Sequence, residues 1–472
     1  MISSSDFNDL IVSSFPFKLT EKQRDCAKKL SCFIFDNSKD LLFVLKGYAG
    51  TGKTTMIGSI LMNLSKTHMK SILLAPTGRA AKLMSLYSNH KSYTIHKYIY
   101  SPKIETDGKI SFILSKNNNK NTLFIVDEAS MISNSNYKSF KFGTGTLLDD
   151  LMKFVYSGTG CKLLLVGDTA QLPPINLTIS PALDIENLEE YTKNIKEIEL
   201  DEVVRQEKSS EILHNATKIR KLIDEGIFNK LKLKFSGIND IIKLEDRFEI
   251  MDAINNSYLK QGKEETMIIV RSNKRANLYN REIRDKILFN DNELSKGDFL
   301  MILRNNYFWL KPETEAGFIA NGDIIEVLEI INFKDLYGFR FAEALIRLID
   351  YPNIKPFEAL LMLDTIMIET PSLSNKSANE LYSEVSKDYN HISGYKKFLA
   401  IKQNKYLNAL QVKFSYAITC HKSQGGQWKN IFIEQPYLPE GLNKEYFRWF
   451  YTAITRAKEK LFLVGFRDEF FD

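Results

Sequence analysis

The chain has 472 residues, of which 44% are apolar, 12% aromatic and 26% charged. This composition is typical of a folded globular protein and excludes disordered, collagen-like and membrane-spanning classes. With 64 Lys and Arg residues against 58 Asp and Glu residues, the net charge of +6 permits a polyanionic partner without requiring one.

The four cysteines, Cys26, Cys32, Cys161 and Cys420, form no CxxC pair and show no metal-ligand spacing with the histidines. We therefore expect a reduced, cytoplasmic protein without structural zinc. No basic N-terminal stretch is followed by an apolar run, and no apolar segment approaches the roughly 18 residues of a membrane span. We expect no membrane association.

Short apolar runs that end abruptly in small or polar residues recur along the chain, as in central parallel strands that feed ligand-binding loops. Two such sets predict two α/β lobes. The runs of the first set are 41–45, 72–75, 123–126 and 163–166, and those of the second are 267–270, 414–418, 431–434 and 461–464.

Two segments between these runs have a different character. Residues 98–121 alternate apolar and polar side chains around Asp107-Gly108, which predicts a β-hairpin. Residues 296–350 contain strand-like runs bounded by Gly or Asn turns and predict a small β-barrel. Residues 375–410 are polar and favour helix.

A glycine-rich segment, GYAGTGKT, spans residues 47–54 after a predicted strand and before a predicted helix. It matches the pattern GxxxxGK[ST], in which backbone N–H groups surround the β- and γ-phosphates of a nucleotide. The helix N-terminus adds positive potential, Lys53 adds a point charge, and Thr54 can ligate Mg²⁺. The predicted nucleotide-binding residues are Gly47, Tyr48, Ala49, Gly50, Thr51, Gly52, Lys53, Thr54 and Thr55.

Acidic and amide side chains follow two further predicted strands. Asp127 and Glu128 follow one of them, where a carboxylate beside a P-loop can hold Mg²⁺ and its neighbour can orient or deprotonate the attacking water. Gln171 follows another in the segment GDTAQLPP, where its amide can contact a γ-phosphate. Arg205 and Arg456 are candidates for a cationic contact to that phosphate.

Taken in chain order, these segments resemble the motifs of superfamily 1 helicases of the RecD/Dda-like branch. The resemblance spans residues 19–458. It is carried by LTEKQ (19–23), GYAGTGKTT, APTGRAAK (75–82), TIHK (94–97), VDEASM (126–131), VGDTAQLPP (166–174), VVRQ (203–206), TCHKSQGGQ (419–427) and YTAITRAK (451–458).

The resemblance implies an ATP-dependent motor that moves 5′ to 3′ along single-stranded DNA and unwinds duplex, with ATP and Mg²⁺ held between two RecA-like domains. It implies that Gln23 reads the adenine and that Gln171 senses the γ-phosphate. Its catalytic residues map onto Lys53, Asp127, Glu128, Gln171, Arg205 and Arg456, with Thr54 and Asp127 at the metal. Its DNA contacts map onto Pro76, Thr77, Arg79, His96, Lys97, His421 and Lys422.

The expected fold is α/β, with two RecA-like parallel-sheet P-loop motor domains, an inserted β-hairpin and an inserted SH3-like β domain. The first motor domain would span 1–195, with 98–121 as the pin that wedges the duplex junction. The second would combine 196–295 with 411–472, and residues 296–410 would form the inserted domain with a helical extension.

Other activities stay open at this stage. A P-loop phosphotransferase or a regulatory ATPase would not need the segments TCHKSQGGQ and YTAITRAK. A nucleic-acid-binding module with an inactive ATPase site would not need Lys53, Thr54, Asp127, Glu128 and Arg456 intact. RNA remains an alternative substrate to DNA, because base stacking and phosphate contacts tolerate either sugar.

Overall fold

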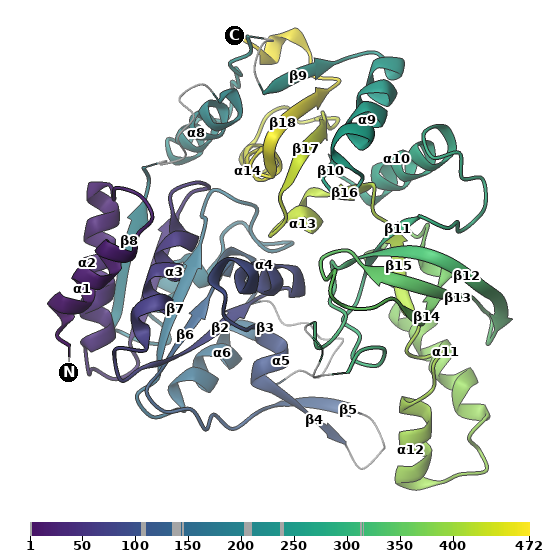
Figure 1. Ribbon diagram of the computed structural model, residues 1–472, viewed down its shortest axis with the longest axis horizontal. Helices are drawn as coiled ribbons and strands as arrows, with labels where there is room; N and C mark the ends of the chain where they lie inside the picture. Colours follow the sequence, from purple (N-terminus) through teal and green to yellow (C-terminus); the bar gives the residue numbers. More distant parts are fainter. Residues whose placement is uncertain are drawn as a thin grey trace. The chain divides into compact units, whose positions relative to one another are not determined.

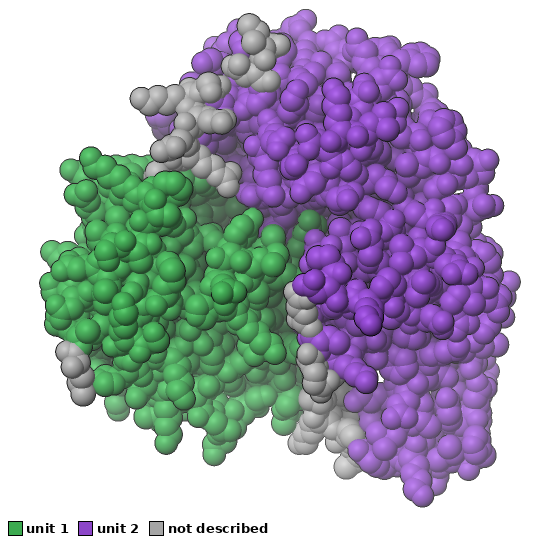
Figure 2. All heavy atoms as spheres, in the orientation of Figure 1, with its two compact units in different colours: residues 1–208 green, residues 209–472 purple. Residues whose placement is uncertain are grey.

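The structure is a computed structural model (Figure 1), and it describes residues 2–104, 110–134, 143, 146–202, 210–236, 240–311, 314 and 316–472. The chain divides into two compact units, Met1–Lys208 and Ser209–Asp472, which Figure 2 draws in green and purple. Each unit contains a parallel sheet, and the second also contains a closed barrel. Within the described residues, no helix combines the length and the apolar character needed to cross a bilayer.

The sheet of unit 1 has six strands among the described residues, all parallel, in the order β3-β2-β6-β7-β1-β8. The strands are β1 Leu42–Gly47, β2 Lys70–Ala75, β3 Ser92–Thr94, β6 Thr122–Val126, β7 Lys162–Gly167 and β8 Ile195–Leu200. Four of them confirm the runs predicted in the first half of the chain. Pairing of β8 with β1 continues this sheet to residue 200.

Both faces of this sheet are covered, which explains why its central strands are continuously apolar. Phe43 and Leu45 pack on one face with side chains of α1, α2 and α3. Leu42 and Val44 point to the other face and pack with α5 and α6. The helices of unit 1 are α1 Ser4–Ser14, α2 Glu21–Phe35, α3 Lys53–Leu64, α4 Gly78–Ser88, α5 Ile95–Ile99, α6 Leu147–Tyr156 and α7 Ile185–Leu188, with 3₁₀ turns Ala129–Met131 and Pro181–Leu183.

The predicted hairpin is present as β4 (Tyr100–Ile104) and β5 (Ile110–Leu114), which pair antiparallel. Asp107 and Gly108 lie outside the described residues.

The sheet of unit 2 is also parallel, with the strand order β16-β10-β17-β18-β9 among the described residues. Its strands are β9 Ile241–Leu244, β10 Thr266–Val270, β16 Ala417–Thr419, β17 Trp428–Glu434 and β18 Ala457–Val464. The helices are α8 Glu211–Asp224, α9 Arg247–Gln261, α10 Asn273–Lys286, α13 Cys420–Ser423 and α14 Lys444–Ile454, with a 3₁₀ turn Asp468–Phe470.

The predicted barrel is closed and lies in the sequence between β10 and β16. Its strands are β11 Phe299–Ile302, β12 Ile324–Leu336, β13 Phe339–Leu348, β14 Phe357–Met362 and β15 Leu410–Phe414, with a 3₁₀ turn Leu363–Thr365. The helix-prone segment forms α11 (Asn375–Lys387) and α12 (Gly394–Lys402). Leu381 and Val385 of α11 pack against the barrel residues Phe341 and Leu360. One role of this extension is therefore to cover the barrel.

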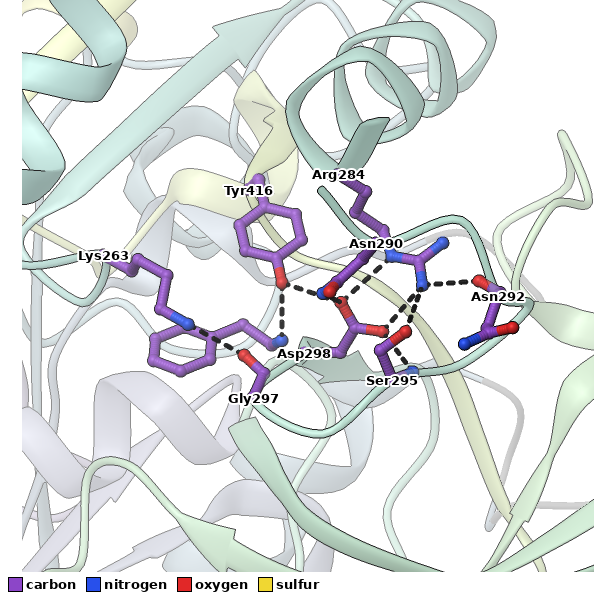
Figure 3. Close-up of polar contacts among 9 residues, drawn as sticks. Lys263, Arg284, Asn290, Asn292, Ser295, Gly297, Asp298 and Tyr416 are labelled. Atoms are coloured by element: carbon purple, nitrogen blue, oxygen red, sulfur yellow. Dashed lines mark hydrogen bonds and ion pairs between the residues drawn. The ribbon is translucent and has the colours of Figure 1, made fainter. Parts of the chain in front are cut away.

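The prediction of one strand over 414–418 is wrong. Phe414 ends β15 in the barrel, whereas β16 starts at Ala417 in the sheet. Tyr416 makes the crossing, and its hydroxyl accepts a hydrogen bond from the Phe299 amide at 3.0 Å and donates one to Asp298 Oδ1 at 3.0 Å (Figure 3). An apolar run can thus continue through a junction, because the junction itself is buried.

Candidate nucleotide and strand sites

The glycine-rich loop connects the end of β1 to the start of α3, as its sequence predicts. Gly50 and Gly52 have φ angles of +79° and +89°, which favour glycine. A Cβ atom added to Gly52 would lie 2.7 Å from Nε2 of Gln23. The backbone conformation therefore favours glycine at position 52, and a larger residue would also displace the Gln23 amide from its place.

Lys53 lies at the first position of α3, and its ammonium bridges two carbonyls of the loop. Nζ donates to the Gly47 carbonyl at 2.7 Å and to the Tyr48 carbonyl at 2.8 Å. Thr54 is exposed in the first turn of the same helix. This end of α3 places a cationic charge, a hydroxyl and helical N–H groups together, the combination that binds phosphate.

Gln23 is buried at the back of the loop. Its Oε1 accepts a hydrogen bond from the Thr20 amide at 3.0 Å, and its Nε2 donates to the Thr51 carbonyl at 3.0 Å. The side chain therefore caps α2 and braces the glycine-rich loop at once. The adenine contact implied for Gln23 stays a prediction.

Asp127 lies at the carboxyl end of β6, at the same edge of the sheet as the end of β1. Its Oδ1 accepts a hydrogen bond from the Glu128 amide at 2.8 Å. Burial raises the pKa of Asp127, while that hydrogen bond and the nearby charge of Lys53 oppose the shift. Glu128 itself has φ +52°, a left-handed conformation that is uncommon outside glycine and often marks a functional position.

Gln171 follows β7, the strand between β6 and β1. Its Nε2 lies 3.5 Å from Oδ2 of Asp168, and its buried Oε1 has no hydrogen-bond partner among the described residues. Asp168 is 1% exposed and also accepts from the Ala170 amide at 2.9 Å. Asp168 belongs to the Gly-Asp step of the segment GDTAQLPP, in which the sequence predicted a role only for Gln171.

The predicted contacts to single-stranded DNA in unit 1 follow two neighbouring β-strands, β2 and β3. Ala75 at the end of β2 is in register with Thr94 at the end of β3, so the loops that follow lie side by side. Thr77 begins α4 by accepting a hydrogen bond from the Ala80 amide, and Thr94 begins α5 by accepting one from Lys97. Pro76, Arg79 and His96 belong to these two helix starts.

Burial lowers the pKa of His96 and, with the nearby charge of Lys91, the pKa of Lys97. The His96 ring is therefore held in its neutral form at physiological pH.

The predicted contacts to single-stranded DNA in unit 2 lie on α13, at the carboxyl end of β16. Nζ of Lys422 donates to Oδ1 of Asn321, on the turn before β12 of the barrel, at 2.8 Å. Burial and the neighbouring charge of Lys413 lower the pKa of Lys422 to about 8, and burial lowers the pKa of His421. Asn321 had no recognisable signal beyond its Asn-Gly-Asp turn.

Arg456 is 4% exposed, and hydrogen bonds within unit 2 engage each nitrogen of its guanidinium. Nε donates to the Thr452 carbonyl at 2.9 Å, Nη1 to the Gly426 carbonyl at 3.3 Å and Nη2 to Thr455 Oγ1 at 3.1 Å. The contact with Gly426 joins Arg456 to the segment just after α13. Arg205, the other predicted arginine, lies outside the described residues.

Two protein families match this chain. An AAA domain family matches residues 18–225, and the UvrD-like helicase C-terminal domain family matches residues 414–464.

Similar proteins extend these matches along the chain. The RecD subunit of the RecBCD enzyme of Buchnera aphidicola is 24% identical over 89% of this chain and 69% of its own length. The DNA helicase Dda of Enterobacteria phage T4 is 23% identical over 89% of this chain and 93% of its own length. Along most of its length, the chain is therefore similar to superfamily 1 helicases of the RecD/Dda-like branch.

An uncharacterised protein of Methanocaldococcus jannaschii is 26% identical to this chain, which covers only 37% of that relative. Among solved structures, a Pif1 helicase from a complex described as unwinding forked duplex DNA has a TM-score of 0.50 at 16% identity. The comparison covers 96% of this chain and 94% of that one, and it supports the fold of two parallel sheets with a barrel.

Proposed function

We propose that this chain is an ATP-driven DNA helicase that moves 5′ to 3′ along single-stranded DNA and opens duplex junctions. One observation carries the proposal. In unit 1, the candidate nucleotide residues follow β1, β6 and β7, and the candidate strand contacts follow β2 and β3, at the same edge of one sheet. Phosphate chemistry and contacts to single-stranded DNA would then be supported by neighbouring β-strands of one sheet.

ATP binding would begin at the glycine-rich loop. The phosphates would replace the carbonyls of Gly47 and Tyr48 as partners of Lys53, since a charged phosphate oxygen is a stronger acceptor than a neutral carbonyl. Gln171 would turn its unpartnered amide oxygen toward the attacking water or its amide nitrogen toward the γ-phosphate. Glu128 would orient that water and accept its proton.

The donor set fits Mg²⁺. Mg²⁺ takes oxygen ligands, with one or two side chains completing a shell of phosphate oxygens and waters. The Asp127 carboxylate and the Thr54 hydroxyl are the oxygen donors that would hold it. Burial disfavours the charged form of Asp127, so a cation beside this carboxylate would compensate a cost already present in the fold. When bound, Mg²⁺ neutralises charge on the phosphates.

Unit 2 would act as the second motor domain, with the barrel as its inserted domain and the β4–β5 hairpin of unit 1 as the pin. Arg456, together with Arg205, would contact the γ-phosphate. To do so, Arg456 would give up its hydrogen bond to Gly426, and this change would reach α13 and its candidate strand contacts His421 and Lys422. This linkage would couple ATP hydrolysis to the affinity of unit 2 for single-stranded DNA.

A tailed-duplex assay tests the proposal. Duplexes with a 5′ or a 3′ single-stranded tail, in DNA and in RNA, are incubated with ATP and Mg²⁺. We expect unwinding of the 5′-tailed DNA alone. Unwinding of the RNA substrate only would favour an RNA helicase. ATP hydrolysis without strand separation on any substrate would favour an ATPase that does not translocate.

A further inference from the structure

The connection between β11 and β12 forms a short ribbon from two antiparallel stretches, 303–310 and 317–323. Asn306 and Ile319 exchange backbone hydrogen bonds of 2.7 and 2.9 Å across it. At its base, the amide of Ala320 donates to Oδ2 of Asp323 at 2.8 Å, and the amide of Gly322 donates to the Ile302 carbonyl at 2.9 Å. These bonds hold the ribbon to the barrel.

The ribbon presents two adjacent aromatic side chains to solvent. Tyr307 is 52% exposed and Phe308 is 38% exposed. The Tyr307 ring stacks on Phe318, with a centroid distance of 5.0 Å and an interplanar angle of 22°. Asn306 Oδ1 accepts from the Phe308 amide at 2.9 Å, which fixes the backbone between the two aromatics. With one face supported and half its surface exposed, Tyr307 offers a preformed platform for a second ring.

A continuous chain of hydrogen bonds runs from this platform to Lys422. Asn305 Nδ2 donates to the Tyr307 hydroxyl at 3.4 Å, and Asn305 Oδ1 accepts from the Asn321 amide at 2.8 Å. Asn321 Oδ1 in turn accepts from Nζ of Lys422 at 2.8 Å. Two asparagines therefore connect an exposed aromatic ring to a cationic side chain on α13.

We propose that this ribbon is a base-stacking site for single-stranded DNA, in which Tyr307 and Phe308 stack on bases while Lys422 contacts the backbone. Binding of a single strand combines aromatic platforms for the bases with positive charge for the phosphates, and the ribbon with α13 supplies both. Exposure alone does not distinguish these rings, because Tyr437 is 87% exposed. What distinguishes the ribbon is that Tyr307 stacks on Phe318 and is connected by hydrogen bonds to Lys422, with Phe308 beside it in the sequence. The inference rests on the proposed function and adds a residue-level site to it.

The test compares two strands that differ only in their bases. Binding of the full chain to a fluorescent oligothymidylate and to an abasic strand of equal length is measured by anisotropy without nucleotide. We expect the native protein to prefer the thymidylate. We expect the double variant Tyr307→Ala/Phe308→Ala to bind thymidylate about tenfold or more weakly and the abasic strand as before.

Two controls separate stacking from other effects. Tyr307→Phe keeps the ring and should keep the base preference, and Tyr437→Ala removes an exposed ring outside the ribbon and should change neither affinity. An unchanged base preference in the double variant, or an equal loss on both strands, would overturn the stacking site. If single-stranded DNA also fails to stimulate ATP hydrolysis by the native protein, the proposed function itself has failed.

Discussion

Asp298 accepts two hydrogen bonds from the guanidinium of Arg284, from Nε at 3.0 Å and from Nη2 at 2.9 Å, and its side chain is fully buried (Figure 3). Arg284 lies on α10 beside the sheet of unit 2, and Asp298 directly precedes the first strand of the barrel. Tyr416, at the return crossing, donates to the same carboxylate. The segment that enters the barrel before β11 and the segment that returns to the sheet before β16 thus both contact one buried ion pair.

Removing one partner of this pair should be costly. Asp298→Ala leaves Arg284 buried without its counter-charge, and such a loss costs about 3–5 kcal/mol of the free energy of unfolding. Asp335→Ala removes an exposed partner of Arg340 and serves as the matched control, with little expected effect. Urea denaturation measures both. Similar free energies of unfolding for the two variants would show that the Arg284–Asp298 ion pair does not stabilise the connection between sheet and barrel.

The glycine-rich loop predicts opposite outcomes for two glycine substitutions. Gly52→Ala places a Cβ atom against Gln23 at a φ angle of +89° and should disrupt nucleotide binding. Gly58→Ala lies within α3 with no heavy atom within 4 Å of the new Cβ, and should stabilise the helix by about 0.5–1 kcal/mol. ATP affinity and thermal unfolding measure the two effects. Normal ATP affinity in Gly52→Ala would contradict this role of the loop.

Lys53→Ala should reduce the rate of ATP hydrolysis about 100-fold or more, because it removes the cation proposed to stabilise charge on the phosphates. Its hydrogen bonds are to loop carbonyls near the surface, so the fold should survive. Turnover is followed by phosphate release, and circular dichroism checks the fold.

Arg456 should behave differently from Lys53. Arg456→Ala should leave ATP binding largely intact and reduce hydrolysis. Arg456→Lys keeps the charge but loses the planar guanidinium, and it separates the role at the phosphate from the internal contacts. Normal turnover in Arg456→Ala would remove this residue from the site.

Affinity for single-stranded DNA should fall as the pH rises from 7 to 9. The pKa of Lys422 is lowered to about 8, so the side chain is charged below that pH and loses its proton above it. The lowered pKa of His421 keeps that ring neutral throughout this range. Lys422→Arg keeps its charge and should make affinity nearly independent of pH. An equally steep pH dependence in that variant would assign the titration to another group.

The sequence predicted much of the fold, because buried parallel strands appear as apolar runs and glycine-rich turns are specific. It did not predict where the run over 414–418 passes from barrel to sheet, since burial at the junction hides the boundary. The residues after β1, β6 and β7 were found from motifs. No role was predicted for Asp168 or Asn321, because their contacts with Gln171 and Lys422 form only in the folded chain.

Steady-state ATP hydrolysis by the full chain, measured with and without single-stranded DNA, tests whether nucleotide turnover is coupled to DNA. The candidate DNA contacts and the candidate nucleotide residues of unit 1 share one edge of its sheet. We therefore expect single-stranded DNA to increase turnover strongly and Lys53→Ala to abolish the increase. Equal turnover with and without DNA would contradict a motor that couples hydrolysis to a strand.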